Sequence, residues 1–497
     1  MQVQKTLAIL FLSVLGLCTF AETLYVNNIS GNDKNDGLSE KTAFASIEKA
    51  FASVKTSDHV EIANTGKPYQ RPYPGERGQE LVPRCGGTAD APLVVNGNGA
   101  VISGLSVIPA EKWKKESEKM YTVFFYPMSN MYKGVKKDNF WFDETQIWWV
   151  DGEAAPNCKS MEALEKVPGA FWWNKAEKKL VFHLPQGKKI GDLKIEIPSN
   201  SGIYITHDHA LVKNFVMIFS WNDGFDIAGS PKNVVYKNCS AYNNCGQGFS
   251  CHNSGNAYYE DCAAIRCASS GACDVHWCNS TYKRCIFVNN TYEAGVYATD
   301  ESVHNYDDCL IAGNRPFEQI WQRSHSKMNF ANCVIVGRAD SLAISSLANG
   351  SVSFKNCTIT DAASVCAVPS SSTASLAIES CVLARCREFF IKLPGVFKDR
   401  FYLKGNLYIG GPGNIIDEKL YGPENWAEYL KLGLEMYSEW RNIELTGPLK
   451  AELPEAVMLK GRHIETSVGA KLPEEVWKRY FKLLKDVPTP AGIIEEK

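Results

Sequence analysis

The stretch Ser351-Val352-Ser353-Phe354-Lys355-Asn356-Cys357 shows the unit from which much of this chain is built. Apolar and polar residues alternate along it, and an aromatic residue and an asparagine precede the cysteine. Alternation with a period of two is typical of a strand with one buried face. Outward from this stretch, the arrangement recurs around a cysteine column formed by Cys239, Cys262, Cys285, Cys309, Cys333, Cys357 and Cys381.

The members of this cysteine column are separated by 23 or 24 residues. A fixed period in the low twenties indicates a solenoid. The leucine framework of leucine-rich repeats is absent, and the repeat contains no helical pattern. We therefore expect an all-β fold, a single-stranded parallel β-helix in which each coil holds three short strands and three turns. Residues 200–400 should form about seven to nine coils, one per period.

The 17 cysteines of the chain would ordinarily suggest disulfides in an exported protein. Stacked coils lie about 4.8 Å apart, so that equivalent cysteines form a ladder. Their parallel Cα–Cβ bonds are poorly aimed for disulfide geometry, whereas cysteine packs well as a small apolar residue. The sequence therefore predicts free thiols in the column.

The N-terminal region adds a family resemblance. The beginning of the chain resembles the opening of secreted, pectate-lyase-like β-helix proteins. The segments that carry this resemblance are Leu24–Asp33, Asp36-Gly37 and Phe44–Ala50. The resemblance implies a right-handed helix, a first strand, a Gly-Asn-Asp turn and a short helix over Ser46–Val54 that caps the solenoid. This superfamily contains lyases, hydrolases, epimerases and binding proteins, so that the resemblance concerns the fold and leaves the reaction open.

Five segments follow from these patterns. Residues 1–21 are predicted to be a signal peptide, because the positive Lys5 precedes the apolar run Leu7–Leu17 and the segment ends in small residues at Ala21. We therefore expect a secreted or periplasmic protein. A net charge of −2 without a basic stripe argues against a nucleic-acid partner. No later run of apolar residues is long enough to span a membrane. We also expect the protein to be a monomer. The remaining segments are a cap with the first coils (22–107), an insert (108–198), regular coils (199–410) and a C-terminal capping segment (411–497).

The insert is rich in tryptophan, and the segments Gly169–Asn174 and Lys179–Leu184 predict a hairpin within it. Its aromatic residues either form a small core of their own or line a wall against which sugars stack. In the C-terminal segment, residues 426–440 and 473–484 have helical patterns and are expected to cover the last coil. The tryptophans of the insert are Trp113, Trp141, Trp148, Trp149, Trp172 and Trp173.

A candidate site emerges when the strands that follow the glycine-rich turns are aligned. Side chains alternate between the two faces of a strand, and the mostly apolar columns must point inward. The inward columns are then Phe225, Phe249, Cys273, Val296, Ile320 and Ile344, with Ile227, Cys251, Val275, Ala298 and Gln322. The outward columns are Asp226, Ser250, Asp274, Tyr297 and Trp321, with Ala228, His252, His276, Thr299 and Arg323, and Asp300 follows at a strand end.

This outward face predicts an enzyme acting on a polysaccharide. For a lyase or C5-epimerase on a uronic-acid polymer, His276 is the candidate base, Asp274 its electrostatic partner and Tyr297 the acid. Arg323 would pair with a substrate carboxylate, and His252, Trp321 and Asp300 would bind substrate. The element Asp274-Val275-His276 also resembles the Asp-Pro-His of alginate C5-epimerases, with valine in place of proline.

Two alternatives stay open at this point. An inverting glycoside hydrolase would use Asp274 as acid and Asp226 as base, two coils apart. A non-catalytic carbohydrate-binding or cell-surface β-helix would use the same face for binding alone. No cofactor or metal is assigned, although His252, Asp274 and His276 are the group that a divalent metal ion would use.

Overall fold

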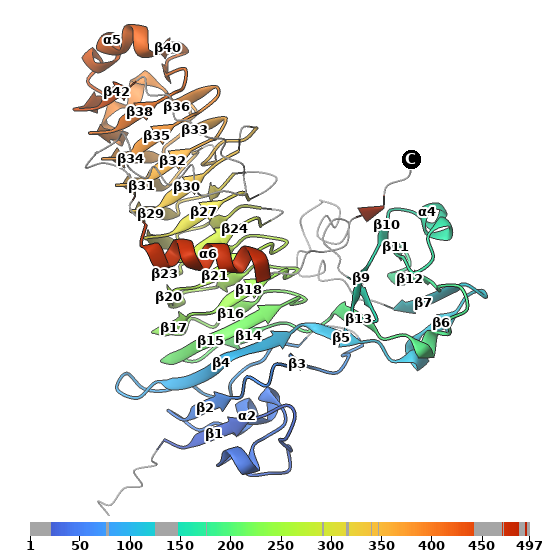
Figure 1. The fold of residues 1–497 in the computed structure, drawn as a ribbon. Helices are drawn as coiled ribbons and strands as arrows, with labels where there is room; N and C mark the ends of the chain where they lie inside the picture. Colours follow the sequence, from blue (N-terminus) through green and yellow to red (C-terminus); the bar gives the residue numbers. More distant parts are fainter. Residues whose placement is uncertain are drawn as a thin grey trace, which may run out of the picture.

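A computed structural model describes residues 21–75, 79–124, 148–174, 176–290, 293–314, 318–338, 340–345, 347–441, 470, 472–486 and 493–494. Parallel strands stack into a solenoid of about eight turns over residues 203–416, seen edge-on in Figure 1. This confirms the predicted all-β parallel β-helix. Residues 1–20 of the predicted signal peptide lie outside the described residues.

The N-terminal cap forms as its sequence predicts. Ser46 caps helix α2 (Ile47–Ser53) by accepting a hydrogen bond from the Lys49 backbone N–H, and Ala50 and Phe51 of the helix are buried. The helix covers the open end of the apolar interior, which would otherwise contact water. The elements of this region are β1 (Thr23–Val26), η1 (Glu40–Thr42), α2, β2 (His59–Ile62), β3 (Tyr69–Gln70) and β4 (Leu93–Ser103).

Each coil contributes two strands to one long sheet that bends around the solenoid. The residue before each cysteine of the column has a positive φ of 51–56°, which turns the chain between these two strands. Asparagine and aspartate tolerate this conformation best, which explains their frequency there. The first strands are β15 (Ala210–Ile218), β17 (Val234–Lys237), β20 (Asn256–Glu260), β23 (Asn279–Lys283), β26 (Val303–Asp307), β29 (Lys327–Ala331), β31 (Ser351–Lys355), β34 (Ser375–Glu379), β37 (Phe401–Lys404) and β41 (Glu435–Met436).

The inner residues of the second strands reach the solenoid core. Between Tyr242 and Val336 the outer side of these strands is apolar as well, and it packs against helix α6 (Glu474–Asp486) on the side of the stack (Figure 1). Parallel strands buried on both faces lose the alternation that marks a half-buried strand. The second strands are β18 (Ser240–Tyr242), β21 (Ala263–Ile265), β24 (Ile286–Val288), β27 (Leu310–Ala312), β30 (Val334–Val336), β32 (Thr358–Thr360), β35 (Val382–Ala384), β38 (Leu407–Ile409) and β42 (Glu439–Arg441).

The third strands of successive coils pair with one another in a separate sheet, which we call the third sheet. A glycine precedes each of its first five strands, where the coils lie too close for a side chain: a Cβ atom at Gly248 would lie 2.3 Å from the Cβ of Ala264 and 2.8 Å from the carbonyl oxygen of Gly271. This third sheet contains β14 (Ile203–Ile205), β16 (Phe225–Ile227), β19 (Phe249–Cys251), β22 (Ala272–Asp274), β25 (Val296–Ala298) and β28 (Ile320–Gln322). Further coils continue it as β33 (Ser364–Ala367), β36 (Phe389–Leu393), β39 (Asn414–Ile416) and β40 (Lys419–Tyr421).

Ladders of identical side chains fill the interior. Stacked rings from Tyr236 to Phe354 have centroids 4.5–5.5 Å apart. The seven column cysteines are fully buried beside them, and each of the sixteen cysteines from Cys85 to Cys386 is a free thiol. The predicted stacking of these cysteines in one buried ladder is confirmed in the described structure.

The insert leaves the solenoid between β4 and β14 and projects to one side (Figure 1). The predicted hairpin is confirmed, because β11 and β12 pair antiparallel. Trp113 and Trp173 are buried around the stacked rings of Phe171 and Phe182, so that these two tryptophans belong to a core and not to a wall. Trp141 lies outside the described residues. The insert contains β5 (Leu105–Val107), η2 (Ala110–Lys112), β6 (Lys114–Lys115), β7 (Met120–Phe124), β8 (Trp148–Val150), β9 (Glu153–Ala155), β10 (Asn157–Cys158), α4 (Met161–Lys166), β11 (Phe171–Asn174), β12 (Lys179–His183), η4 (Ile190–Asp192) and β13 (Ile195–Pro198).

The C-terminal region differs in part from its expected arrangement. Helix α5 (Trp426–Lys431) is short, and β42 takes up residues at the end of the segment expected to be helical. Trp426 and Tyr429 of α5 pack on the end of the solenoid core, whereas α6 covers the side of the coils instead of the last one. The remaining elements are η5 (Gly395–Arg400), η6 (Pro423–Asn425) and β43 (Ile493–Ile494), which pairs with β10. Among the described residues, no helix combines the length and apolar character needed to cross a membrane.

Candidate active site

The outer face of the third sheet carries a compact polar cluster at its N-terminal end. Asp226 on β16 and Ser250 on β19 are register partners and point outward, since Phe225 and Ile227 on either side of Asp226 are fully buried. Asp223 reaches the same place from the turn before β16, and His252 follows β19. We call Asp223, Asp226, Ser250 and His252 the outer cluster.

Ser250 links the members of the outer cluster. Its Oγ lies 2.6 Å from Oδ1 of Asp226, 3.0 Å from Oδ2 of Asp223 and 3.1 Å from Nε2 of His252. A hydroxyl can donate one hydrogen bond and accept two. If all three contacts are hydrogen bonds, one carboxylate accepts from Ser250, while His252 and the other carboxyl donate to it. The geometry therefore suits a pair of carboxyl groups that holds one proton.

Burial explains why the pair retains a proton near neutral pH. Asp223 is 4% exposed, and the side chain of Asp226 is 13% exposed. Burial, followed by the charge of Asp226, raises the pKa of Asp223 to about 7. Burial likewise raises the pKa of Asp226 to about 7. The backbone N–H of Gln247 donates to Oδ1 of Asp223 at 2.7 Å and holds that carboxyl in place.

The outer cluster also has the composition of a metal site. One ligand atom from each of Asp223, Asp226 and His252 lies within 4.8 Å of the others. Carboxylate oxygens and an imidazole nitrogen suit a divalent cation, which would have to displace the shared proton. This group differs from the predicted combination of His252, Asp274 and His276, of which the structure brings only His252 into the cluster.

The expected outward position of Asp274 is wrong. Its register partner is the inward-facing Cys251, and its side chain is fully buried inside the solenoid. There Oδ1 accepts a hydrogen bond from the Tyr282 hydroxyl at 2.9 Å, and Oδ2 lies 3.4 Å from Nδ1 of His304. A residue enclosed in this way cannot contact a polysaccharide, so Asp274 serves neither as partner of His276 nor as the acid of a hydrolase.

His276 and Asp300 occupy turns at the end of the third sheet, where Asn253, His276 and Asp300 all have φ near +60°. Their side chains link successive turns, since the Asn253 N–H donates to Nδ1 of His276 at 3.3 Å and the His276 N–H donates to Asp300 at 2.9 Å. The place expected for His276 is taken by Val275, so Asp274 and His276 do not share one outward face. The catalytic role of His276 and the binding role of Asp300 stay predictions.

Tyr297, Trp321 and Arg323 lie on the outer face as predicted. Tyr297 and Trp321 are register partners with ring centroids 5.1 Å apart. The Arg323 guanidinium stands 5.5 Å from the centroid of the Trp321 ring, and its Nη1 donates to the Tyr297 hydroxyl at 3.5 Å. Burial raises the pKa of Tyr297 to about 12, so that this phenol keeps its proton.

Two carboxyl groups of this face were not predicted. Asp223 belongs to the outer cluster, and the motif Asp223-Gly224-Phe225-Asp226, with two acids around a turn, was the available signal. Glu293 accepts hydrogen bonds from Ser269 and Ser270 at 2.7 and 2.9 Å, and burial raises its pKa. Glu293 precedes the glycine of its coil in a stretch without strand alternation, which hid it.

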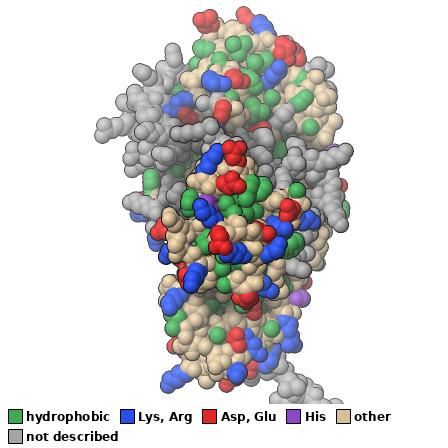
Figure 2. All heavy atoms as spheres, turned by 90° about the vertical axis from the view of Figure 1, so that its right-hand side faces the viewer, with side chains coloured by type: hydrophobic (Ala, Val, Ile, Leu, Met, Phe, Trp, Pro, Cys, Tyr) green, Lys and Arg blue, Asp and Glu red, His purple; other side chains and the backbone are tan. Residues whose placement is uncertain are grey.

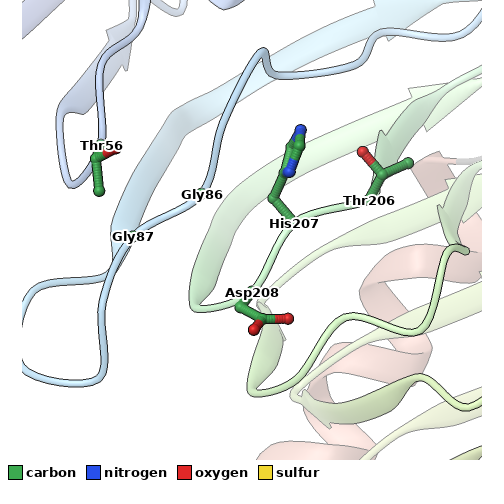
Figure 3. A pocket seen from close by; sticks show the side chains of 6 residues that line it. All are labelled: Thr56, Gly86, Gly87, Thr206, His207 and Asp208. Carbon is green, nitrogen blue, oxygen red and sulfur yellow. The ribbon is translucent and has the colours of Figure 1, made fainter.

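A cavity of about 340 Å³ lies away from the outer cluster (Figure 3). It is lined by Thr56 on one side and by Thr206 and His207 on the other, with Gly86 and Gly87 between them. None of the predicted site residues lines it. Figure 2 shows acidic and basic side chains interspersed on the side of the molecule that it presents, with no continuous basic stripe among the described atoms.

Comparison with known proteins concerns the fold. Residues 180–335 match the family model described as "Right handed beta helix region". No curated protein sequence matched the chain. Three of the solved structures similar to it are "The complex structure of XylC with xylose" (10% identity, 80% of this chain and 86% of that chain, TM-score 0.46), "Crystal structure of pectate lyase Pel9A" (14%, 73% and 79%, 0.41) and "Rhamnogalacturonan lyase" (12%, 93% and 99%, 0.38).

At these identities the likeness says nothing about a reaction. Together, the family-model match, the strand pairing and the stacked ladders agree with the resemblance seen at the N-terminus. The chain folds as a right-handed parallel β-helix.

Proposed function

We propose that this chain is an exported enzyme that acts on a uronic-acid-containing polysaccharide and removes the proton next to a uronate carboxylate. The observation that carries the proposal is the hydrogen-bonded pair of Asp223 and Asp226 around Ser250, whose carboxyl groups both have a pKa of about 7. A general base works best when its pKa lies near the operating pH.

The chemistry needs one group to take a proton and another to supply one. The ionised carboxylate of the pair would take the proton from C5 of the uronate. In a lyase, the C4–O bond then breaks, a C4=C5 double bond forms, and the protonated carboxyl or His252 gives a proton to the departing oxygen. In an epimerase, a water molecule on the opposite face returns a proton to C5 and no bond to oxygen breaks. Both reactions begin with the same proton transfer.

An inverting hydrolase fits this geometry less well. Inverting glycosidases hold their two carboxyl groups about 6.5–9.5 Å apart, which leaves room for a water molecule. The predicted pair of Asp226 and Asp274 is excluded because Asp274 is enclosed in the core. Asp223 and Asp226 have oxygen atoms within 4.8 Å of each other, closer than the inverting arrangement.

The test is a panel of neutral and uronic-acid polysaccharides incubated with the full chain. Products are scored for ultraviolet absorbance, new reducing ends and inverted C5 configuration. We expect unsaturated or epimerised uronates from the wild type and a loss of at least about 10²-fold in Asp226→Asn. Asp90→Asn, at an exposed turn, is the matched control. Reducing ends without unsaturation would favour the hydrolase, and binding without turnover would favour a carbohydrate-binding protein.

A further inference from the structure

The outer face carries a second group of side chains that is separate from the outer cluster. Tyr297, Trp321 and Arg323 contact one another on β25, β28 and the residue after β28. Trp321 is half-buried and Arg323 is exposed, so this aromatic and cationic group is open to a ligand. The ring of Trp321 and the hydroxyl of Tyr297 hold the guanidinium in one place, which lowers the entropy cost of binding to it.

The charge of Arg323 has no ion-pair partner within the part of the chain that the structure describes. Other arginines of the solenoid surface do have one, since Arg284, Arg338 and Arg385 each contact an aspartate at 2.8–2.9 Å. The positive charge of Arg323 favours the ionised form of the nearby Glu293 carboxyl group, but the hydrogen bonds that Glu293 accepts come from Ser269 and Ser270. Arg323 therefore presents a fixed cation to the outside of the sheet.

The separation of the two groups follows from the strand register. Asp226, Ser250, Cys273, Tyr297 and Trp321 are successive partners across neighbouring coils. Tyr297 and Trp321 thus stand three and four coils from Asp226, about 14 and 19 Å at the usual strand spacing. A single sugar residue cannot contact the carboxyl pair and Arg323 together, whereas several linked pyranose rings can.

We propose that Tyr297, Trp321 and Arg323 form a remote subsite that binds a uronate residue of the polysaccharide several sugars away from the residue that reacts. The inference rests on the proposed function and adds a requirement for substrate length and charge. The C–H face of a pyranose would stack on Trp321. The uronate carboxylate would accept two hydrogen bonds from Arg323, a geometry that lysine cannot reproduce.

The experiment uses the uronate polymer that the panel identifies, its size-fractionated oligomers and carboxyl-reduced polymer. For Arg323→Ala and Arg323→Lys, we expect KM on the polymer to rise about ten-fold or more, the scale of a hydrogen bond to a charged group, while kcat changes far less. The defect should shrink as the oligomers become shorter, and carboxyl-reduced polymer should show little difference between variant and wild type. Arg387→Ala, at an exposed arginine of another coil, is the control.

An equal loss on all lengths, or a fall in kcat with unchanged KM, would overturn the remote subsite. If the wild type turns over no uronate polymer, the proposed function fails and the subsite is tested by retardation in gels containing polygalacturonate or alginate. The subsite then predicts that Arg323→Ala abolishes retardation while Asp226→Asn retains it. Equal retardation of Arg323→Ala and the wild type would contradict it.

Discussion

Two sets of aspartate, histidine and hydroxyl groups lie on opposite sides of the same layer of strands. Outside, Asp226 contacts Ser250 and His252 at 2.6 and 3.5 Å. Inside, Asp274 contacts Tyr282 and His304 at 2.9 and 3.4 Å. Both sets have the composition of an acid–base site, and their aspartates come from strands two coils apart in one sheet.

The difference between them is access. Asp274 and His304 have no exposed surface, and burial lowers the pKa of His304, which favours the neutral imidazole. The His304 ring also contacts Ser302 and the Tyr306 hydroxyl, so its polar atoms are satisfied within the core. The inner set therefore stabilises the solenoid, whereas the side chain of His252 is one-third exposed and can meet a substrate. Composition alone does not distinguish a structural set from a catalytic one.

The largest effect on stability is expected at the inner set. Asp274→Ala removes the acceptor of the Tyr282 hydroxyl, which is left buried without a hydrogen-bond partner, and takes away the carboxylate beside the His304 ring. An unsatisfied buried donor costs about 1–3 kcal/mol in the free energy of unfolding, and the space left by the deleted carboxyl group adds to this loss. Urea unfolding followed by circular dichroism should show this loss. A variant as stable as the wild type would mean that Asp274 is not enclosed as described.

The outer set should show the opposite behaviour. Asp226→Asn keeps the shape of the side chain and removes its acid–base capacity, so that turnover should fall by about 10²–10⁴-fold. The free energy of unfolding at pH 8 should not decrease, because an ionised, largely buried carboxylate is replaced by a neutral amide. Steady-state rates and urea unfolding on the same preparation check both halves. A large loss of stability would place Asp226 with the inner set.

The pH dependence of stability should also separate the two sets. The carboxyl groups of Asp223 and Asp226 have a pKa of about 7 in the fold, above the ordinary value of 3.8. Between these values the folded state binds more protons than the unfolded state, so their contribution falls as the pH rises from about 4 to 7. Asp223→Asn lacks one of these titrating groups. Its free energy of unfolding should therefore fall less between pH 5 and pH 8 than that of the wild type. An unchanged difference between the two pH values would argue against shared protonation of the pair.

The smallest effect compares two cysteines of the same sheet. Cys251 points into the core, and Cys273 is the outward partner of Ser250. Cys251→Ser replaces a closely packed sulfur atom of the core with a more strongly hydrated hydroxyl and should cost about 1–3 kcal/mol. Cys273→Ser places the hydroxyl on the outer face, where Ser250 is the register partner, and should cost less than Cys251→Ser. Thermal unfolding of the two variants measures the contrast, and equal losses would remove the distinction between the two faces here.

The sequence predicted the coils because their signals repeat. The cysteine and the turn residue before it recur in seven coils and the aromatic residue in six of them, so one error would not hide the period. The site depended on a single alignment, in which Gly248 was paired with Ala272 instead of Gly271. A shift of one residue exchanges the two faces of a strand, and it moved Asp274 from the core to the surface.

The correct pairing was available in the repeat itself. Cys239 to Gly248 and Cys262 to Gly271 both span nine residues, so that the short gap of 23 between these cysteines carries over to the third sheet. Asp226, His252, Tyr297, Trp321 and Arg323 were placed on the outer face correctly because their coils have no such change. Asp223 and Glu293 come from turns, where the alternation rule says nothing about side-chain direction.

The pH dependence of kcat/KM tests the central claim most directly, namely that the outer cluster holds one exchangeable proton near neutral pH and performs the chemistry. Rates are measured on the preferred uronate polymer from pH 4 to 9 for the wild type, Asp226→Asn and Asp90→Asn. We predict a limb in the wild type and in Asp90→Asn that rises with a midpoint near pH 7, since the base must be ionised. A midpoint near pH 4, or the same limb and rate in Asp226→Asn, would contradict the account.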